Sequence, residues 1–192
     1  MEKQYRRFFL VSVLIMSGMY FFPIWSIELG APQFPEGLGF YIWLDKMTGF
    51  NENDLNSING LNHYIGMQAI EPDSIAELKY MPYIVAVLIV LGVAAFLINK
   101  KSVYWSWLVL LVIVMLAGLV DFYLWEYNYG HNLDPRAAIK IPGMSFQPPL
   151  IGYKQILNMK AISLPHIGGI LPGITLLTTF YLLIKSRKRA NA

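Results

Sequence analysis

The sequence has no cysteine, only three histidines and few charged residues for a chain of 192. Without cysteine the chain can form no disulfide, no thiolate nucleophile and no cysteine metal site. It also lacks a phosphate-binding glycine loop, a nucleophile elbow and a haem attachment motif. With 14% charged and 56% hydrophobic residues, it is too apolar for a typical soluble domain. These properties argue against an enzyme and favour a small integral membrane protein.

The hydrophobic residues gather into four runs, at residues 8–27, 81–98, 103–127 and 165–184. Each run is close to the ~20 residues that a helix needs to cross a bilayer. We therefore predict an all-α integral membrane protein in which residues 1–192 form a single domain of four transmembrane helices. The first run follows basic residues, as in a secretory signal, but it is rich in aromatic residues and has no small-x-small cleavage site. We expect it to be a retained anchor.

The clusters of basic residues that flank these runs all fall on one side of the predicted membrane: Lys3, Arg6, Arg7, Lys100, Lys101, Lys185, Arg187, Lys188 and Arg189. The positive-inside rule places that side, with both termini, in the cytoplasm. This explains the net charge of +3 without a nucleic-acid partner, and the lipid bilayer is the expected one. Segments 28–80 and 128–164 are left outside, as two ordered extracytoplasmic segments.

The outer segments carry local signals of their own. Residues 31–39 are rich in proline and glycine and cannot form a regular helix. Residues 40–44 are apolar enough to lie on the membrane surface or to pair as a short strand. Residues 51–62, rich in asparagine and aspartate, predict caps and turns around one short helix. Ser74 and Glu77 have the spacing of a capping box before the second run, so that helix is expected to begin ahead of the bilayer.

His63 and Met67 are four residues apart, so on a helical turn both side chains would point the same way. An imidazole nitrogen and a thioether sulfur together suit monovalent copper, because thioether favours that ion over zinc or magnesium. The remaining ligands of a copper site would come from the other outer histidines and methionines: His131, His166, Met47, Met144 and Met159. The alternative is that the methionines fill apolar gaps and the histidines are hydrogen-bonded surface residues.

Asp121 is the one carboxylate well inside a hydrophobic run, and Glu126 follows five residues later. A helix that enters the membrane at Val103 has risen ~27 Å by Asp121, so this residue should lie near the outer interface. A carboxylate at that depth is costly unless it is paired. It could orient a histidine, pass a proton, or pair with Arg136 or Lys140, and a purely structural snorkelling role is equally compatible with its position.

The strings APQFPEGLGFYIW, INGLNHYIGM and QPPLIGYKQILN resemble a type of small bacterial membrane protein encoded beside nitrous oxide reductase, the NosB type of nos-cluster accessory protein. The resemblance covers most of the chain but includes no catalytic signature. It implies a role in the maturation of, or electron supply to, a periplasmic copper enzyme, and it identifies no functional residues.

Three functions are compatible with these observations. The leading hypothesis is a non-enzymatic accessory protein that binds or presents copper at the outer face. The second is a docking module for a copper reductase or a copper chaperone, in which the methionines only pack. The third is a subunit that meets quinol at the aromatic-rich interface, with Asp121 or Glu126 accepting protons.

Overall fold

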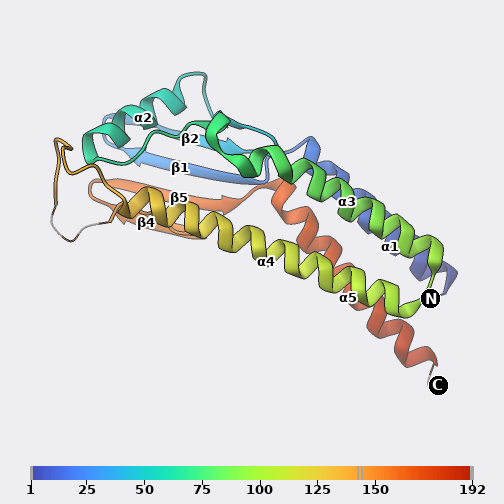
Figure 1. The fold of residues 1–192 in the computed structure, drawn as a ribbon. Coiled ribbons are helices and arrows are strands. Elements are labelled where there is room, and N and C mark those ends of the chain that lie inside the picture. Colours follow the sequence, from blue (N-terminus) through green and yellow to red (C-terminus); the bar gives the residue numbers. More distant parts are fainter. Residues whose placement is uncertain (1, 142, 144, 191–192) are drawn as a thin grey trace.

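The computed structural model describes residues 2–141, 143 and 145–190. These residues form a mixed α/β protein, with a five-stranded antiparallel sheet at one end and long helices at the other (Figure 1). The prediction of an all-α protein is therefore wrong. The prediction of four transmembrane helices is also wrong, because only three of the described helices are long and apolar enough to cross a membrane.

The chain begins with helix α1 (Lys3–Ile15), which continues into the 3-10 turn η1 (Met16–Tyr20). The next elements are β1 (Trp25–Ala31), β2 (Phe34–Ile42), β3 (Met47–Gly49), α2 (Asp54–Ile65) and η2 (Pro72–Ser74). The three long apolar helices are α3 (Ala76–Ile98), α4 (Lys101–His131) and α5 (Ile167–Ala190). The hairpin of β4 (Gly152–Ile156) and β5 (Met159–Pro165) lies between α4 and α5. The three long helices overlap the last three predicted runs.

The first hydrophobic run is divided between a helix and a strand. Helix α1 has 13 residues, fewer than the ~20 of a full span. From Trp25 onward the side chains alternate between the covered and uncovered sides of the sheet, so that Ile27 is buried and Glu28 is exposed. This two-residue period is typical of a strand with one covered face. It begins inside the run, and hydropathy alone therefore extended the predicted helix too far.

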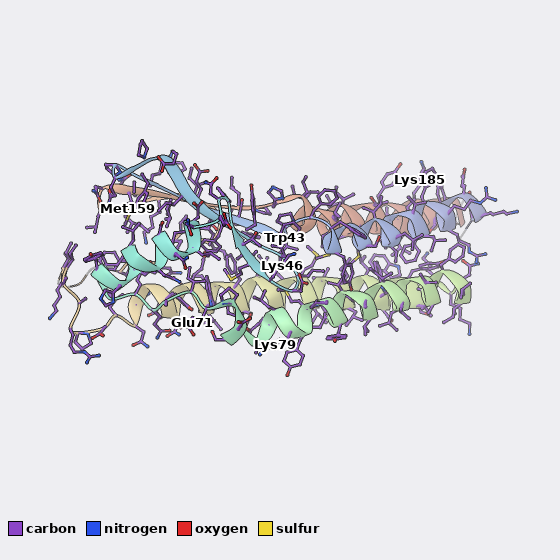
Figure 2. The ribbon with its side chains drawn as sticks, turned by 90° about the horizontal axis from the view of Figure 1, so that it is seen from above. Trp43, Lys46, Glu71, Lys79, Met159 and Lys185 are labelled. Atoms are coloured by element: carbon purple, nitrogen blue, oxygen red, sulfur yellow. The ribbon has the colours of Figure 1, made fainter. Side chains whose placement is uncertain are left out.

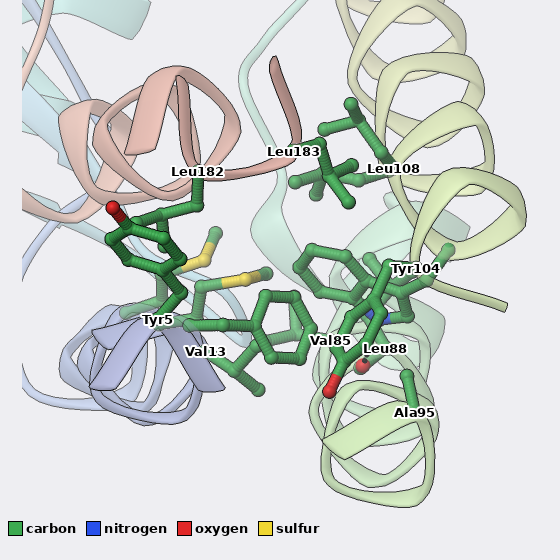
Figure 3. Close-up of a cluster of buried hydrophobic side chains, with 14 of the residues drawn as sticks. Tyr5, Val13, Val85, Leu88, Ala95, Tyr104, Leu108, Leu182 and Leu183 are labelled. Carbon is green, nitrogen blue, oxygen red and sulfur yellow. Dashed lines mark hydrogen bonds between the residues drawn. The ribbon is translucent and has the colours of Figure 1, made fainter. Parts of the chain in front are cut away.

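The helices form a bundle in which α1 packs against α3 and α5, and α4 packs against the same two helices. At its centre the Phe9 ring lies edge-on to Tyr104 and Trp107, with ring centroids 4.8 and 5.2 Å apart. Figure 3 shows the buried side chains around it, with Val13 from α1, Leu88 from α3 and Tyr104 from α4. The Trp107 indole donates a hydrogen bond of 2.9 Å to the carbonyl of Leu88, and the Thr175 hydroxyl donates one of 2.7 Å to the carbonyl of Ser12. These bonds join α4 to α3 and α5 to α1, so polar groups help to align the helices.

The strand order is β3-β2-β1-β5-β4, and every neighbouring pair is antiparallel. Because β1 pairs with β5, the two outer segments form one sheet rather than two separate loops. Helix α2 and the last turns of α4 cover one face of this sheet. Both chain ends and the turn between α3 and α4 lie together at the opposite end of the molecule (Figure 1).

Several local predictions can be compared with these elements. The short helix expected within residues 51–62 is confirmed by α2, and residues 40–42 pair as a strand. The capping box is wrong, because the Ser74 hydroxyl donates to the carbonyl of Glu71 and α3 begins at Ala76 without a side-chain cap.

The five strands, helix α2 and the loops between them are called the sheet domain below. Gly130 provides a test of how α4 is fixed to the sheet domain. The amide of Phe146 donates a 2.9 Å hydrogen bond to the carbonyl of Gly130, and a Cβ at Gly130 would collide with the backbone of Gln147. Because backbone cannot move aside cheaply, Gly130→Ala should lower stability by ~1–3 kcal/mol. The check is the thermal unfolding midpoint of the purified protein in detergent.

Gly118 is the matched control on the same helix, since a Cβ there meets no atom within 4 Å. Gly118→Ala should leave the midpoint unchanged or raise it slightly, because alanine favours helix. Equal midpoints for the two variants would contradict the close packing at Gly130.

Candidate functional site

A partly open cavity of about 60 Å³ lies beneath the covered face of the sheet. It is lined by the sheet, by helices α2 and α4, and by the segments that follow these two helices. The sheet contributes Ile27 and Phe40, helix α2 contributes Ile58 and Ile65, and helix α4 contributes Trp125. The walls are therefore mainly apolar. The lining residues that carry polar or sulfur atoms include Asn62, Glu126, Met67 and Met159.

Glu126 is the most unusual residue of the cavity. Its side chain is 0% exposed, and neither carboxyl oxygen has a hydrogen-bond partner among the described residues. Helix α4 has 31 residues and a length of ~46 Å, which exceeds the ~30 Å hydrocarbon core of a bilayer. Glu126 lies in the last turns of α4, in the part of the helix that exceeds the thickness of the bilayer core and packs against the sheet domain. Burial raises the pKa of the Glu126 carboxyl from 4.5 to about 8, so the neutral form predominates at pH 7.

Neighbouring polar groups are held by other partners. The Tyr129 hydroxyl donates a 3.1 Å hydrogen bond to the carbonyl of Ala69, and the amide nitrogen of Asn62 donates a 3.3 Å bond to the carbonyl of Gln68. Both bonds tie the chain after α2 to the cavity wall. They also leave Glu126 as the group in this wall whose hydrogen-bonding capacity is unused. Buried polar groups nearly always have a hydrogen-bond partner, so we expect a ligand or a water molecule to pair with this carboxyl.

The structure places His63 and Met67 on different sides of the chain. Helix α2 ends at Ile65, and Gly66 takes a left-handed conformation with φ of 81°. The amides of Gly66 and Met67 donate to the carbonyls of His63 and Asn62, the pattern of a Schellman motif. Met67 thus turns back to line the cavity, whereas His63 is exposed. The four-residue spacing does not place them on one helical face, because the helix ends between them.

The other predicted ligands are distributed over the sheet domain. His131 is exposed at the end of α4, where its ring stacks on Tyr127 at 4.0 Å. His166 is half-buried at the start of α5 and lies edge-on to Tyr41. Met47 is buried in β3, outside the cavity lining, and Met144 lies outside the described residues. Within residues 2–141, 143 and 145–190, no three His, Asp or Glu side chains are grouped as metal ligands.

Met159 lies at the start of β5, in the sheet domain and far from the Lys185 end of the molecule (Figure 2). It is buried and lines the same cavity as Met67 and Glu126. Of the predicted metal ligands and the two predicted carboxylates, the structure therefore brings together Met67, Met159 and Glu126.

Asp121 is exposed on α4, and no described side chain pairs with it through a hydrogen bond or an ion pair. Arg136, which we considered as its partner, instead bonds to Asp134 at 3.2 Å. That guanidinium holds the pKa of the Asp134 carboxyl below its usual value. Asp121 and Glu126 thus differ in environment, although they are only five residues apart.

The cavity could not be predicted from the sequence. Its walls come from β1, β2, α2, the chain after α2, α4 and the β4–β5 hairpin, which no sequence spacing brings together. The available signal was a lone glutamate in the string Trp125-Glu126-Tyr127, at the end of a helix longer than a bilayer requires.

No known protein-family model matches the sequence, and a comparison with curated proteins also finds no match. The site is therefore interpreted from its own geometry and chemistry.

The raised pKa of Glu126 predicts how stability changes with pH. A carboxyl that is neutral in the folded state and ionises near 4.5 when unfolded stabilises the fold fully below pH 4.5, and this contribution is lost as the pH rises through about 8. The unfolding midpoint of the wild type should therefore fall between pH 5 and about 8.

In Glu126→Gln this part of the decrease should be absent, because glutamine does not ionise. Thermal unfolding in detergent across this pH range measures the difference. Glu28→Gln, at an exposed position on the other face of the sheet, is the control and should follow the wild type. Parallel curves for wild type and Glu126→Gln would show that Glu126 is solvated and charged.

Proposed function

We propose that this protein is a multi-pass protein of the bacterial inner membrane that acts as a non-enzymatic accessory protein, with its sheet outside the cytoplasm. Helices α3, α4 and α5 supply the apolar spans, and α1 with η1 packs beside them. The basic residues of the chain ends and of the α3–α4 turn support a cytoplasmic location for that end. Exposed aromatic residues suit the outer interface: Tyr20, Phe21, Tyr80, Tyr83 and Tyr123.

The uncovered face of the sheet is the observation that carries the accessory role. Glu28, Ile162 and Tyr153 are register partners across β1, β5 and β4, so they form one row on this face. Tyr153 is 75% exposed, and the Lys160 ammonium lies 5.0 Å from the centre of its ring. The opposite face is already covered by α2 and α4. A partner can therefore dock on this surface without disturbing the core.

This row has the composition of a surface that binds another protein reversibly. Tyrosine is enriched among the residues that dominate binding energy, and a non-obligate interface is about as apolar as the rest of a protein surface. Because the sheet is anchored by β1 to η1 and by β5 to α5, its position relative to the helices is fixed. A partner would meet a preformed surface and would lose little free energy in ordering it.

The class of partner comes from the resemblance to NosB-type proteins. The three strings behind that resemblance, at residues 31–43, 58–67 and 147–158, all lie in the sheet domain or in α2. They are thus in the part of the chain that we propose meets the partner. On this basis the partner is a periplasmic copper enzyme, nitrous oxide reductase, or a copper chaperone that serves it.

The proposed orientation predicts which positions an impermeant thiol reagent can reach. The chain has no cysteine, so single cysteines are unambiguous labels. Asn158→Cys, at the exposed tip of the β4–β5 hairpin, should be labelled in intact cells with a permeabilised outer membrane. Ser102→Cys, exposed in the first turn of α4, should be labelled only after the inner membrane is opened. The reverse pattern would contradict the orientation.

The docking role predicts that Tyr153→Ser weakens binding to purified nitrous oxide reductase at least tenfold, because an exposed tyrosine at the centre of an interface is a typical hot spot. The measurement is the equilibrium dissociation constant on the immobilised full-length protein. Nitrous oxide reduction by cells that carry the variant should fall correspondingly at equal expression.

Tyr64→Ser is the matched control, since this tyrosine is 58% exposed but lies on α2, away from the uncovered face. It should retain wild-type binding. If the wild-type protein binds no reductase, or if both tyrosine variants bind equally well, the uncovered face is not the docking surface.

A further inference from the structure

The cavity beneath the sheet combines an apolar wall with a carboxyl group that has no hydrogen-bond partner within the described chain. Glu126 is fully buried, and both of its oxygens are unpaired. Leaving a carboxyl group unpaired in an apolar environment is costly in either protonation state. The adjoining space of about 60 Å³ can hold a ligand that satisfies it. The question is which ligand the surrounding side chains select.

Apart from Glu126, the cavity lining offers mainly soft sulfur atoms as metal ligands and few oxygen atoms. Met67 and Met159 contribute thioethers, and Asn62 contributes an amide whose nitrogen already bonds to Gln68. Calcium needs six to eight oxygen ligands, and magnesium needs an octahedral oxygen set. Structural zinc takes four thiolate, imidazole or carboxylate ligands. The cavity matches none of these sets. Thioether sulfur selects copper(I) among the metals available to proteins.

We propose that this cavity binds one monovalent soft cation, copper(I), between the thioethers of Met67 and Met159 and the carboxylate of Glu126. The positive charge of the cation balances the negative charge of the carboxylate, so the occupied cavity carries no net charge. This matters because an uncompensated charge in an apolar cavity is strongly unfavourable. The assignment differs from a histidine site, because His63 and His131 are exposed and line no part of this cavity.

The two methionines and Glu126 come from different elements of the fold. Met67 directly follows the left-handed Gly66 that ends α2, and Met159 follows the two-residue turn at Leu157 and Asn158. Each methionine therefore stands next to a chain reversal, which is buried at Gly66 and exposed at Asn158. Glu126, in contrast, is held inside a long helix. The three proposed ligands are thus supplied by three separate parts of the chain.

The test is an anaerobic competition titration of the purified full-length protein in detergent against a chromophoric copper(I) chelator. The wild type should bind one copper(I) per chain. The double variant Met67→Leu with Met159→Leu should bind at least tenfold more weakly, while its elution volume and unfolding midpoint stay close to those of the wild type. Leucine keeps the volume and hydrophobicity of methionine and removes only the sulfur. Copper-edge X-ray absorption should show sulfur neighbours in the wild type and fewer in the double variant.

Two controls make the result specific to this cavity. Met47→Leu removes a buried thioether from the same sheet domain but from outside the cavity lining, and His63→Ala removes an exposed imidazole. Both variants should bind copper(I) like the wild type. Absence of copper(I) binding by the wild type would overturn the proposal. Equal affinity of the double variant and the wild type would also overturn it.

The metal site does not depend on the docking role. Copper(I) binding is measured on the isolated protein, whereas docking is measured with the reductase. A protein that binds copper(I) through Met67 and Met159 but does not bind the reductase would support this site and refute docking at the uncovered face.

Discussion

The joint between β1 and α5 is the contact on which the rest of the structure depends. The amides of His166 and Gly168 donate to the carbonyls of Ile24 and Pro23, at 3.1 and 2.8 Å. These bonds satisfy backbone donors at the start of α5, close to the proposed membrane boundary, where an unpaired amide would be costly. On one side of the joint β1 pairs with β5, and on the other η1 packs against α5. Sheet and bundle are thus fastened together by backbone.

Glycine makes this joint possible. A Cβ at Gly168 or Gly169 would collide with the carbonyl oxygens of Phe22 or Ile24, so the crossing chain could not reach the helix end. Gly173, which shares the small-residue spacing with Gly169, has open space around it. Close approach is therefore needed only at the first turn of α5. The cavity at Glu126 depends on the same joint. By fixing the sheet to the start of α5, the joint determines which turns of α4 lie beneath the sheet.

The helices were the predictable part of the fold. The residues of α3, α4 and α5 are apolar over a membrane length, which is a property of the local sequence. The sheet was not predictable in the same way. Trp25 and Ile27 are as apolar as the helix before them, and the pairing of β1 with β5 joins positions such as Trp25 and Pro165 that lie far apart in the chain. Residue type predicted Met67 and Met159 as ligands, but Gly66 and the β4–β5 turn determine where their side chains lie. Glu126 was predicted only as a carboxylate near the membrane interface that could accept protons.

The pairing of β1 with β5 also has a consequence for biosynthesis. Strand β1 is central in the finished sheet, yet its second neighbour is synthesised only after α2, α3, α4 and β4. A nascent chain therefore holds β1 with one unpaired edge until the β4–β5 hairpin has been synthesised. Such an edge is a template for pairing with other chains, and long-range pairing of this kind forms slowly. Because β5 directly precedes α5, the sheet is completed only when the chain has been synthesised up to its last helix.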